Sequence, residues 1–240
     1  MNLKLISISL VMLLFTFVLS DSKNLSAQQS LEIESMDSKP YGKSLPEWTG
    51  LWWQWWLGMT HTGGEETHVF EDNEGKYCDR GQIGPVWFIS ATSRPGAIPT
   101  CDIPYGKSIL VPILIHECST FENPGVDLYQ CTSNMAEGFE GLHLQYQDTR
   151  FNHEEIVKNF RVDNASFVVN FPDKDYINVI PVGLSNAAAA GYWVMFKPPA
   201  IGLYEIKFGG IAYEESINPI GPKKVSFYVD QTYRLNITQS

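Results

Sequence analysis

Apolar and polar residues alternate with a period of two over much of the second half of the chain. The alternation is clearest near the C-terminus, at Val225, Phe227 and Val229, and resumes at Tyr233 and Leu235. A period of two predicts half-buried strands. Further runs rich in β-branched and aromatic residues, punctuated by Pro, Gly, Asp and Asn, occupy residues 166–171, 176–180, 192–196 and 202–208.

The middle of the chain carries similar signals. Residues 86–89 and 109–115 are apolar runs, and Pro112 interrupts the second, which predicts a bulge or an edge position. Residues 142–146 alternate again, whereas the four alanines at 187–190 indicate a helical turn or a tight bend. Short strands at this spacing, with few long helices, predict a mainly β fold: a β-sandwich of jelly-roll or immunoglobulin-like type.

One segment near the N-terminal side has helical periodicity instead. Ser44 and Glu47 form a capping-box pattern, and apolar residues at helical spacing follow over residues 45–59. Five of the seven tryptophans lie in this segment. They suit either a helix buried against a sheet or a stacking platform for sugar rings, and the spacing favours burial. Weaker Asn-x-x-Glu signals at Asn134 and Asn152 predict one or two short helices.

The N-terminus has the layout of a secretory signal peptide. Lys4 precedes an apolar run over residues 5–19, which suits cleavage after Ser20. An uncleaved anchor is the alternative, and no later segment is apolar enough to span a membrane. We therefore expect a signal peptide at 1–20, a flexible leader at 21–43 and a single domain at 44–240. The protein is then exported: secreted, periplasmic or on the cell surface.

Composition narrows the function classes. The 240 residues are 44% hydrophobic and 18% charged, which excludes a disordered chain. The net charge of -10 disfavours a nucleic acid as partner, because such a footprint needs clustered Lys and Arg.

The four cysteines acquire a meaning in an exported chain. Cys78, Cys101, Cys118 and Cys131 allow two disulfides in three connectivities. The pairs 78–101 and 118–131 are favoured because each closes a short local loop. A metal site is the alternative, although no pair has C-x-x-C spacing.

The order of several motifs resembles a family of exported bacterial and archaeal proteins with no established activity. In that family a tryptophan-rich helix precedes a Cys and a G-Q-x-G-P-V-W-F strand, and a second Cys, an I-P-x-G-K turn and a G-Y-W-V strand follow. The matching segments here are residues 52–56, Cys78, 81–88, Cys101, 103–107 and 191–194, with a hairpin at 202–210. The loop at 60–77 departs from the pattern. The resemblance implies an exported β-rich domain, supports the pairing of Cys78 with Cys101, and implies no activity. We expect no cofactor.

Two groups of residues are candidates for chemistry. His61 and His68 share an acid-rich loop, and together with His116 they are candidate metal ligands, since neutral imidazoles bind copper or zinc. Glu117 and Asp102 lie near the cysteines and are candidate binding residues. With Glu122 and Asp79 they are also the acids that a carbohydrate-active enzyme would need across a cleft.

No serine-hydrolase elbow, phosphate loop or zinc-protease motif is present in the sequence. The first hypothesis is therefore a non-enzymatic module that binds an unknown ligand or a cell-envelope partner. The carbohydrate-active enzyme and the metal-binding protein are the alternatives.

Overall fold

The computed structural model describes residues 30–62, 67–179, 181–213 and 224–239. The expected signal peptide at residues 1–20 lies outside the described residues. The fold is mainly β, as the sequence predicts, with two sheets and few helices. Its helices and strands are α1 (Leu45–Leu57), β1 (Val86–Phe88), β2 (Thr100–Pro104), β3 (Ser108–Ser119), α2 (Leu128–Glu137), β4 (Glu140–Tyr146), β5 (Thr149–Phe151), α3 (His153–Asn159), β6 (Arg161–Phe171), β7 (Gly183–Phe196), β8 (Gly202–Tyr213) and β9 (Val225–Thr238). Single 3-10 turns lie at Pro40–Gly42 and Val69–Glu71.

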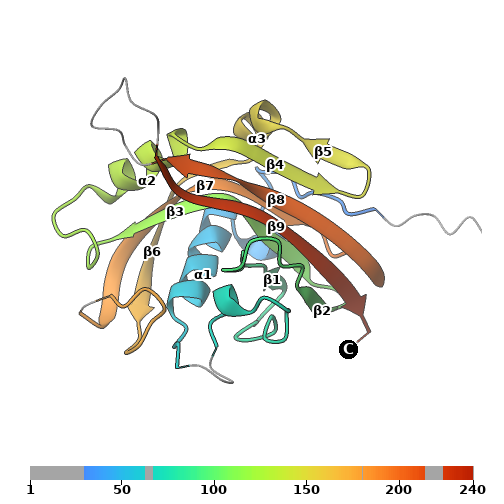
Figure 1. Ribbon diagram of the computed structural model, residues 1–240, viewed down its shortest axis with the longest axis horizontal. Helices are drawn as coiled ribbons and strands as arrows, with labels where there is room; N and C mark the ends of the chain where they lie inside the picture. Colours follow the sequence, from blue (N-terminus) through green and yellow to red (C-terminus); the bar gives the residue numbers. More distant parts are fainter. Residues whose placement is uncertain (1–29, 63–66, 180, 214–223, 240) are drawn as a thin grey trace, which may run out of the picture.

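The strands form two mixed sheets (Figure 1). One has four strands in the order β1-β3-β7-β6, and the other has five in the order β2-β9-β8-β4-β5. Most neighbours are antiparallel, but β1 pairs in parallel with β3, and β2 pairs in parallel with β9. The register of β3 against β7 shifts between Pro112 and Leu114, which confirms the irregularity predicted at Pro112.

The main hydrophobic core joins the two sheets. Ile109 and Ile113 of β3 belong to the same buried cluster as Phe208 of β8 and Leu235 of β9. The inward side chains alternate along β9, as the period of two predicts. At about 25 cal/mol per Å² of apolar surface removed from water, this burial is the largest favourable contribution to folding.

Helix α1 covers the other face of the four-stranded sheet and builds a second core. It packs mainly on β6 and also on β7 (Figure 1). The Ser44–Glu47 capping box is formed, and the helix runs over Leu45–Leu57, close to the predicted 45–59. The indole of Trp52 meets that of Trp193 edge to face at 5.3 Å and donates its N–H to the carbonyl oxygen of Ile89 at 2.7 Å. The structure thus supports the buried helix over the sugar platform.

Two predicted local structures were wrong. Residues 187–190 are not a turn but lie within β7, where all four alanines are buried. Their small side chains let helices approach both faces of the strand, α1 on one and α2 on the other. Residues 176–179 form no strand, because the carboxylate of Asp175 accepts from the N–H of Val179 and closes a turn there.

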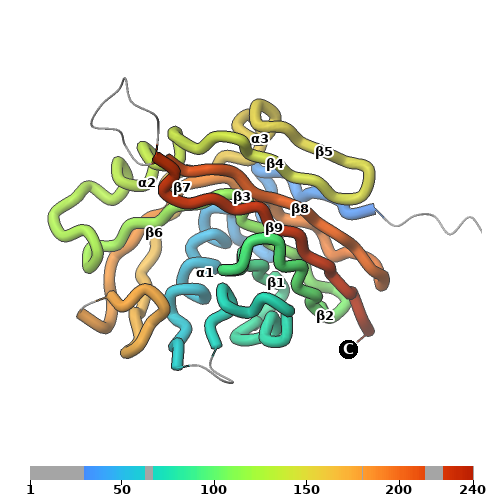
Figure 2. Tube along the Cα trace, viewed as in Figure 1, coloured from blue at the N-terminus to red at the C-terminus, as the bar shows by residue number. Residues whose placement is uncertain are grey.

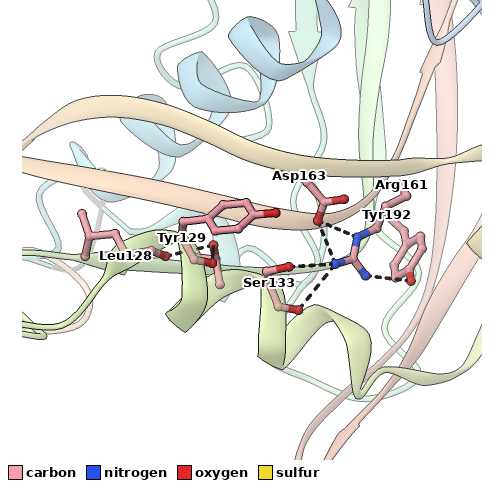
Figure 3. Close-up of polar contacts among 7 residues, drawn as sticks. Leu128, Tyr129, Ser133, Arg161, Asp163 and Tyr192 are labelled. Carbon is pink, nitrogen blue, oxygen red and sulfur yellow. Dashed lines mark hydrogen bonds and ion pairs between the residues drawn. The ribbon is translucent and has the colours of Figure 1, made fainter.

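Helix α2 begins earlier than the weak signal at Asn134 suggested, because the side chain of Asp127 accepts from the N–H of Gln130 and caps it. It is held to the sheet by Arg161, the first residue of β6 (Figure 3). The guanidinium pairs with Asp163 at 2.7 Å, donates to the hydroxyl of Tyr192 at 3.1 Å and reaches the carbonyl oxygen of Ser133 at 3.4 Å. The half-buried charge is therefore satisfied from three elements.

Part of the expected leader packs on the domain. Leu31 is buried, and Ile33 forms an isolated bridge with Phe196 of β7. Both favoured disulfides are present: Cys78–Cys101 joins a loop to β2, and Cys118–Cys131 joins β3 to α2. Within the described ranges, no helix has the length and apolar character needed to cross a membrane.

Candidate functional site

The two edges of strand β9 are covered very differently. On one edge β8 pairs along nearly the whole strand, from Val225 to Ile237. On the other edge β2 pairs only with residues 234–238. Over the residues that the structure describes, the second edge of 225–230 therefore has no strand partner. Such an edge presents backbone N–H and C=O groups that another strand can pair with.

A groove of about 480 Å³ lies beside this unpaired edge. Its far wall is the segment 91–95, which Figure 2 shows in green next to the red trace of β9. Phe70 contributes an aromatic surface, and the side chain of Tyr228 is 54% exposed. The groove thus combines an open strand edge with two aromatic rings. We call it the β9 groove.

Gln231 fixes the wall of the β9 groove to the strand. Its amide oxygen accepts from the N–H of Thr92 at 2.9 Å and from the hydroxyl of Thr92 at 2.8 Å. Its amide nitrogen donates to the carbonyl oxygen of Ala97 at 3.0 Å. Ser93 is held in turn, because its N–H donates to the carbonyl oxygen of Phe70 at 2.6 Å. Gln231, which is only 3% exposed, therefore holds the segment 91–95 beside β9.

The two charged residues that line the β9 groove differ in their ion pairing. The carboxylate of Asp230 lies 2.9 Å from the ammonium of Lys207 and 3.4 Å from the imidazole of His143. The hydrogen bond from Lys207 lowers the pKa of Asp230 below its usual range. The guanidinium of Arg94, in contrast, has no ion pair within the described part of the chain. The uncompensated charge at the groove is therefore positive.

Sequence reasoning found the strand but missed the groove. The alternation at 225–229 was visible, but no sequence signal placed residues 91–95 beside it. The groove follows from pairing: β2 has only five residues and β9 has fourteen. No local pattern in the sequence shows that β2 is too short to cover the whole edge of β9.

The structure places His61 and His68 close together, but their ring nitrogens already have hydrogen-bond or ion-pair partners. His68 is buried, its Nδ1 accepts from the N–H of Phe70 at 3.1 Å, and its Nε2 lies 2.9 Å from the carbonyl oxygen of Trp56. Burial lowers the pKa of His68 to about 4, so the ring is neutral near pH 7. The Nε2 of His61 lies 3.5 Å from a carboxylate oxygen of Glu71. His68 has no free lone pair for a metal while these bonds persist.

His116 lies apart from that pair, on β3. Its Nε2 is 3.5 Å from the Sγ of Cys118. In the described ranges, the group of three possible metal ligands that comes together is His116, Cys118 and Cys131. The three candidate histidines are therefore not brought to one site.

The candidate acids separate into two pairs. Glu117 contacts Glu122 on the four-stranded sheet side, where burial and the charge of Glu122 raise the pKa of Glu117 well above its usual range. Asp102 lies on β2 of the other sheet and accepts from the side-chain amide of Asn236 at 2.7 Å. It shares a hollow of about 430 Å³ with Asp79 beside Cys78. Glu117 and Asp102 thus do not line a common cleft.

Comparison with known proteins gives no family. No family model and no curated protein matches the chain. Among solved structures, a match covers 58% of this chain and 89% of the solution structure of Amebosin, at 13% identity and a TM-score of 0.19. A TM-score this low supports no conclusion about fold or function.

Proposed function

We propose that this protein is an exported β-sandwich module that binds an extended peptide segment in the β9 groove. The observation that carries the proposal is the edge of residues 225–230, which no strand in the described part of the chain pairs with and which faces a groove of about 480 Å³. A strand added at such an edge gains main-chain hydrogen bonds, and pockets for alternate side chains give specificity.

The groove suggests the chemistry of the peptide. A six-residue edge is about 20 Å long at roughly 3.3 Å per residue, so it suits a strand of about that length. Phe70 and Tyr228 offer apolar surface to an aromatic or branched side chain of the ligand. Arg94 favours a carboxylate in the peptide, because an Arg and a carboxylate form two parallel hydrogen bonds. The preferred ligand is an extended peptide with one acidic residue and at least one bulky apolar residue.

The signal peptide expected at residues 1–20 and the two disulfides support export, since disulfides persist in oxidising compartments. The family resemblance of the Trp-rich helix and the G-Q-x-G-P-V-W-F strand supports the same location. A secreted or envelope-bound partner with a flexible tail is the kind of protein that would supply the peptide.

The test begins with selection of random dodecapeptides displayed on phage against the oxidised protein lacking residues 1–20. A selected peptide, labelled with fluorescein, is then titrated with protein and followed by fluorescence anisotropy. Two variants probe the groove, each with a matched control elsewhere on the surface. Tyr228→Ser is compared with Tyr105→Ser, since these tyrosines are 54% and 57% exposed, and Arg94→Glu is compared with Arg150→Glu.

Tyr228→Ser is expected to weaken binding about thirtyfold, since a buried aromatic anchor contributes about 2 kcal/mol. Arg94→Glu should weaken it about tenfold by reversing the charge that faces the ligand carboxylate. Both controls should bind like the unmodified protein. If no peptide is selected, or if the selected peptides ignore both groove variants, the proposal fails.

A further inference from the structure

Strand β3 and helix α2 bring three potential metal ligands together at the Cys118–Cys131 disulfide. His116 and Cys118 are two residues apart in β3, so their side chains point to the same face. Cys131 comes from α2, which packs on β3 and β7. The partners of His116 and Cys118 on β7 are Ala190 and Ala188, whose small side chains leave this face open to α2.

The distances suit a shared ion. The Nε2 of His116 lies 3.5 Å from the Sγ of Cys118. Two ligands of a tetrahedral Zn²⁺ ion, at about 2.3 Å for sulfur and about 2.0 Å for nitrogen, lie about 3.5 Å apart. All three ligand atoms lie within 4.8 Å of one another. The two sulfurs have to separate to about 3.8 Å once their bond is broken.

The imidazole of His116 can act as a metal ligand. His116 is partly buried on β3, and an unprotonated imidazole offers a lone pair to a cation. The other disulfide provides an internal comparison. Within the described residues, no third ligand is grouped with Cys78 and Cys101 in the way that His116 is grouped with Cys118 and Cys131.

We infer that reduction of the Cys118–Cys131 disulfide creates a binding site for one Zn²⁺ ion, held by both thiolates and by His116, with water as fourth ligand. Two thiolates and one imidazole with an open fourth position are an established zinc ligand set. The site is independent of the β9 groove, so either proposal can fail without the other.

The reaction balances with a dithiol as reductant. The dithiol gives two electrons and two protons to the disulfide, the S–S bond breaks, and the dithiol closes into its own disulfide. The two resulting thiols then lose their protons to solvent as Zn²⁺ binds, because the thiolate is the metal ligand. The disulfide between β3 and α2 is thus replaced by a cross-link through the metal ion.

The experiment compares oxidised and reduced protein. The full chain without residues 1–20 is reduced with dithiothreitol, desalted under argon and titrated with Co²⁺ as a spectroscopic substitute for Zn²⁺. Thiolate-to-cobalt charge transfer reports sulfur ligation, and displacement by Zn²⁺ gives the relative affinity. We expect one ion per reduced chain and no thiolate band in the oxidised protein.

Variants assign the ligands. Cys118→Ser with Cys131→Ser should abolish the band, whereas Cys78→Ser with Cys101→Ser should retain it. His116→Asn should weaken Zn²⁺ binding about tenfold or more. His153→Asn is the matched control and should bind like the parent. Circular dichroism of each variant checks that it folds.

X-ray absorption at the zinc edge on the reduced, zinc-loaded parent protein needs no variant. Two sulfurs and one imidazole in the first shell support the site. The absence of stoichiometric binding, a shell without sulfur, or a dependence of binding on Cys78 and Cys101 would overturn it.

Discussion

The Nε2 of His68 lies 2.9 Å from the carbonyl oxygen of Trp56, inside an aromatic cluster that joins the end of α1 to the loop before β1. Since Nδ1 accepts from the N–H of Phe70, the proton of the neutral ring sits on Nε2 and is donated to Trp56. Tyr176 stacks on the same imidazole with ring centroids 4.7 Å apart. The neutral imidazole of His68 therefore holds this loop against the end of α1.

This arrangement predicts a pH-dependent stability. Burial lowers the folded-state pKa of His68 from 6.5 to about 4, so the unfolded chain takes up the proton first as the pH falls. The stabilisation is fully present above about pH 6.5 and is lost progressively between that value and pH 4. The loss attributable to His68 is up to about 3 kcal/mol, since each pKa unit corresponds to about 1.4 kcal/mol.

Urea denaturation at pH 7 and at pH 4.5, on the parent protein and on His68→Gln, measures this contribution. The variant should show a smaller loss of stability on acidification. His116 and Glu117 are present in both proteins, so their contributions to the pH dependence cancel when the variant is compared with the parent. An equal pH dependence in the two proteins would mean that His68 is not held neutral by the fold.

Among the tryptophans of α1, Trp52 is predicted to lose the most folding stability when it is replaced with Phe. Trp52→Phe removes the N–H that Ile89 accepts and part of the contact with Trp193, and should cost about 2–3 kcal/mol. Trp55→Phe also loses a hydrogen bond, to the carbonyl oxygen of Arg80, but Trp55 is only partly buried and the change should cost less. Chemical denaturation ranks the two variants, and the reverse order would contradict the assigned packing.

Gly209 of β8 has no room for a side chain. A Cβ atom there would lie 1.9 Å from the carbonyl oxygen of Val229 on β9, in backbone that cannot move away cheaply. Gly209→Ala should therefore destabilise the protein by about 3 kcal/mol. Gly138→Ala, where the nearest atom is 3.5 Å away, is the control and should be close to neutral. Thermal unfolding distinguishes them, and a neutral Gly209→Ala would show that the β8–β9 pairing differs.

The Cys78–Cys101 disulfide closes a loop of 23 residues and holds the segment beneath the acidic hollow to β2. Replacing both cysteines with Ala should lower the free energy of unfolding by about 3 kcal/mol, mainly because the unfolded chain is no longer constrained. Guanidinium titration under non-reducing conditions gives the value. A loss below about 0.5 kcal/mol would indicate that the loop is held without the disulfide.

Local signals in the sequence predicted local structure well. Ser44 and Glu47 located the start of α1, and Pro112 located the irregularity in β3, because each acts on its own backbone neighbours. The alanines at 187–190 misled for the same reason: their role depends on the helices that pack on both faces of β7. Helix α2 was underestimated, because its cap Asp127 lies in a polar stretch without a clear period.

The functional candidates depended on long-range placement, which the sequence does not contain. His116 and His68 were grouped by residue type, yet His68 is committed to backbone hydrogen bonds and His116 lies beside two cysteines. Glu117 and Asp102 were grouped by proximity to cysteines, yet they belong to different sheets. The β9 groove arises where a short strand stops along a long one, and no local pattern predicts how two such strands align.

The central claim is that the edge of residues 225–230 accepts a peptide strand. Amide hydrogen exchange along β9, measured by NMR with and without a selected peptide, tests it most directly. We predict that the amides of 225–230 not paired with β8 exchange fast in the free protein and become protected in the complex, while residues 234–238 change little. Protection of these amides in the free protein, or protection in the complex confined to another surface, would contradict the account.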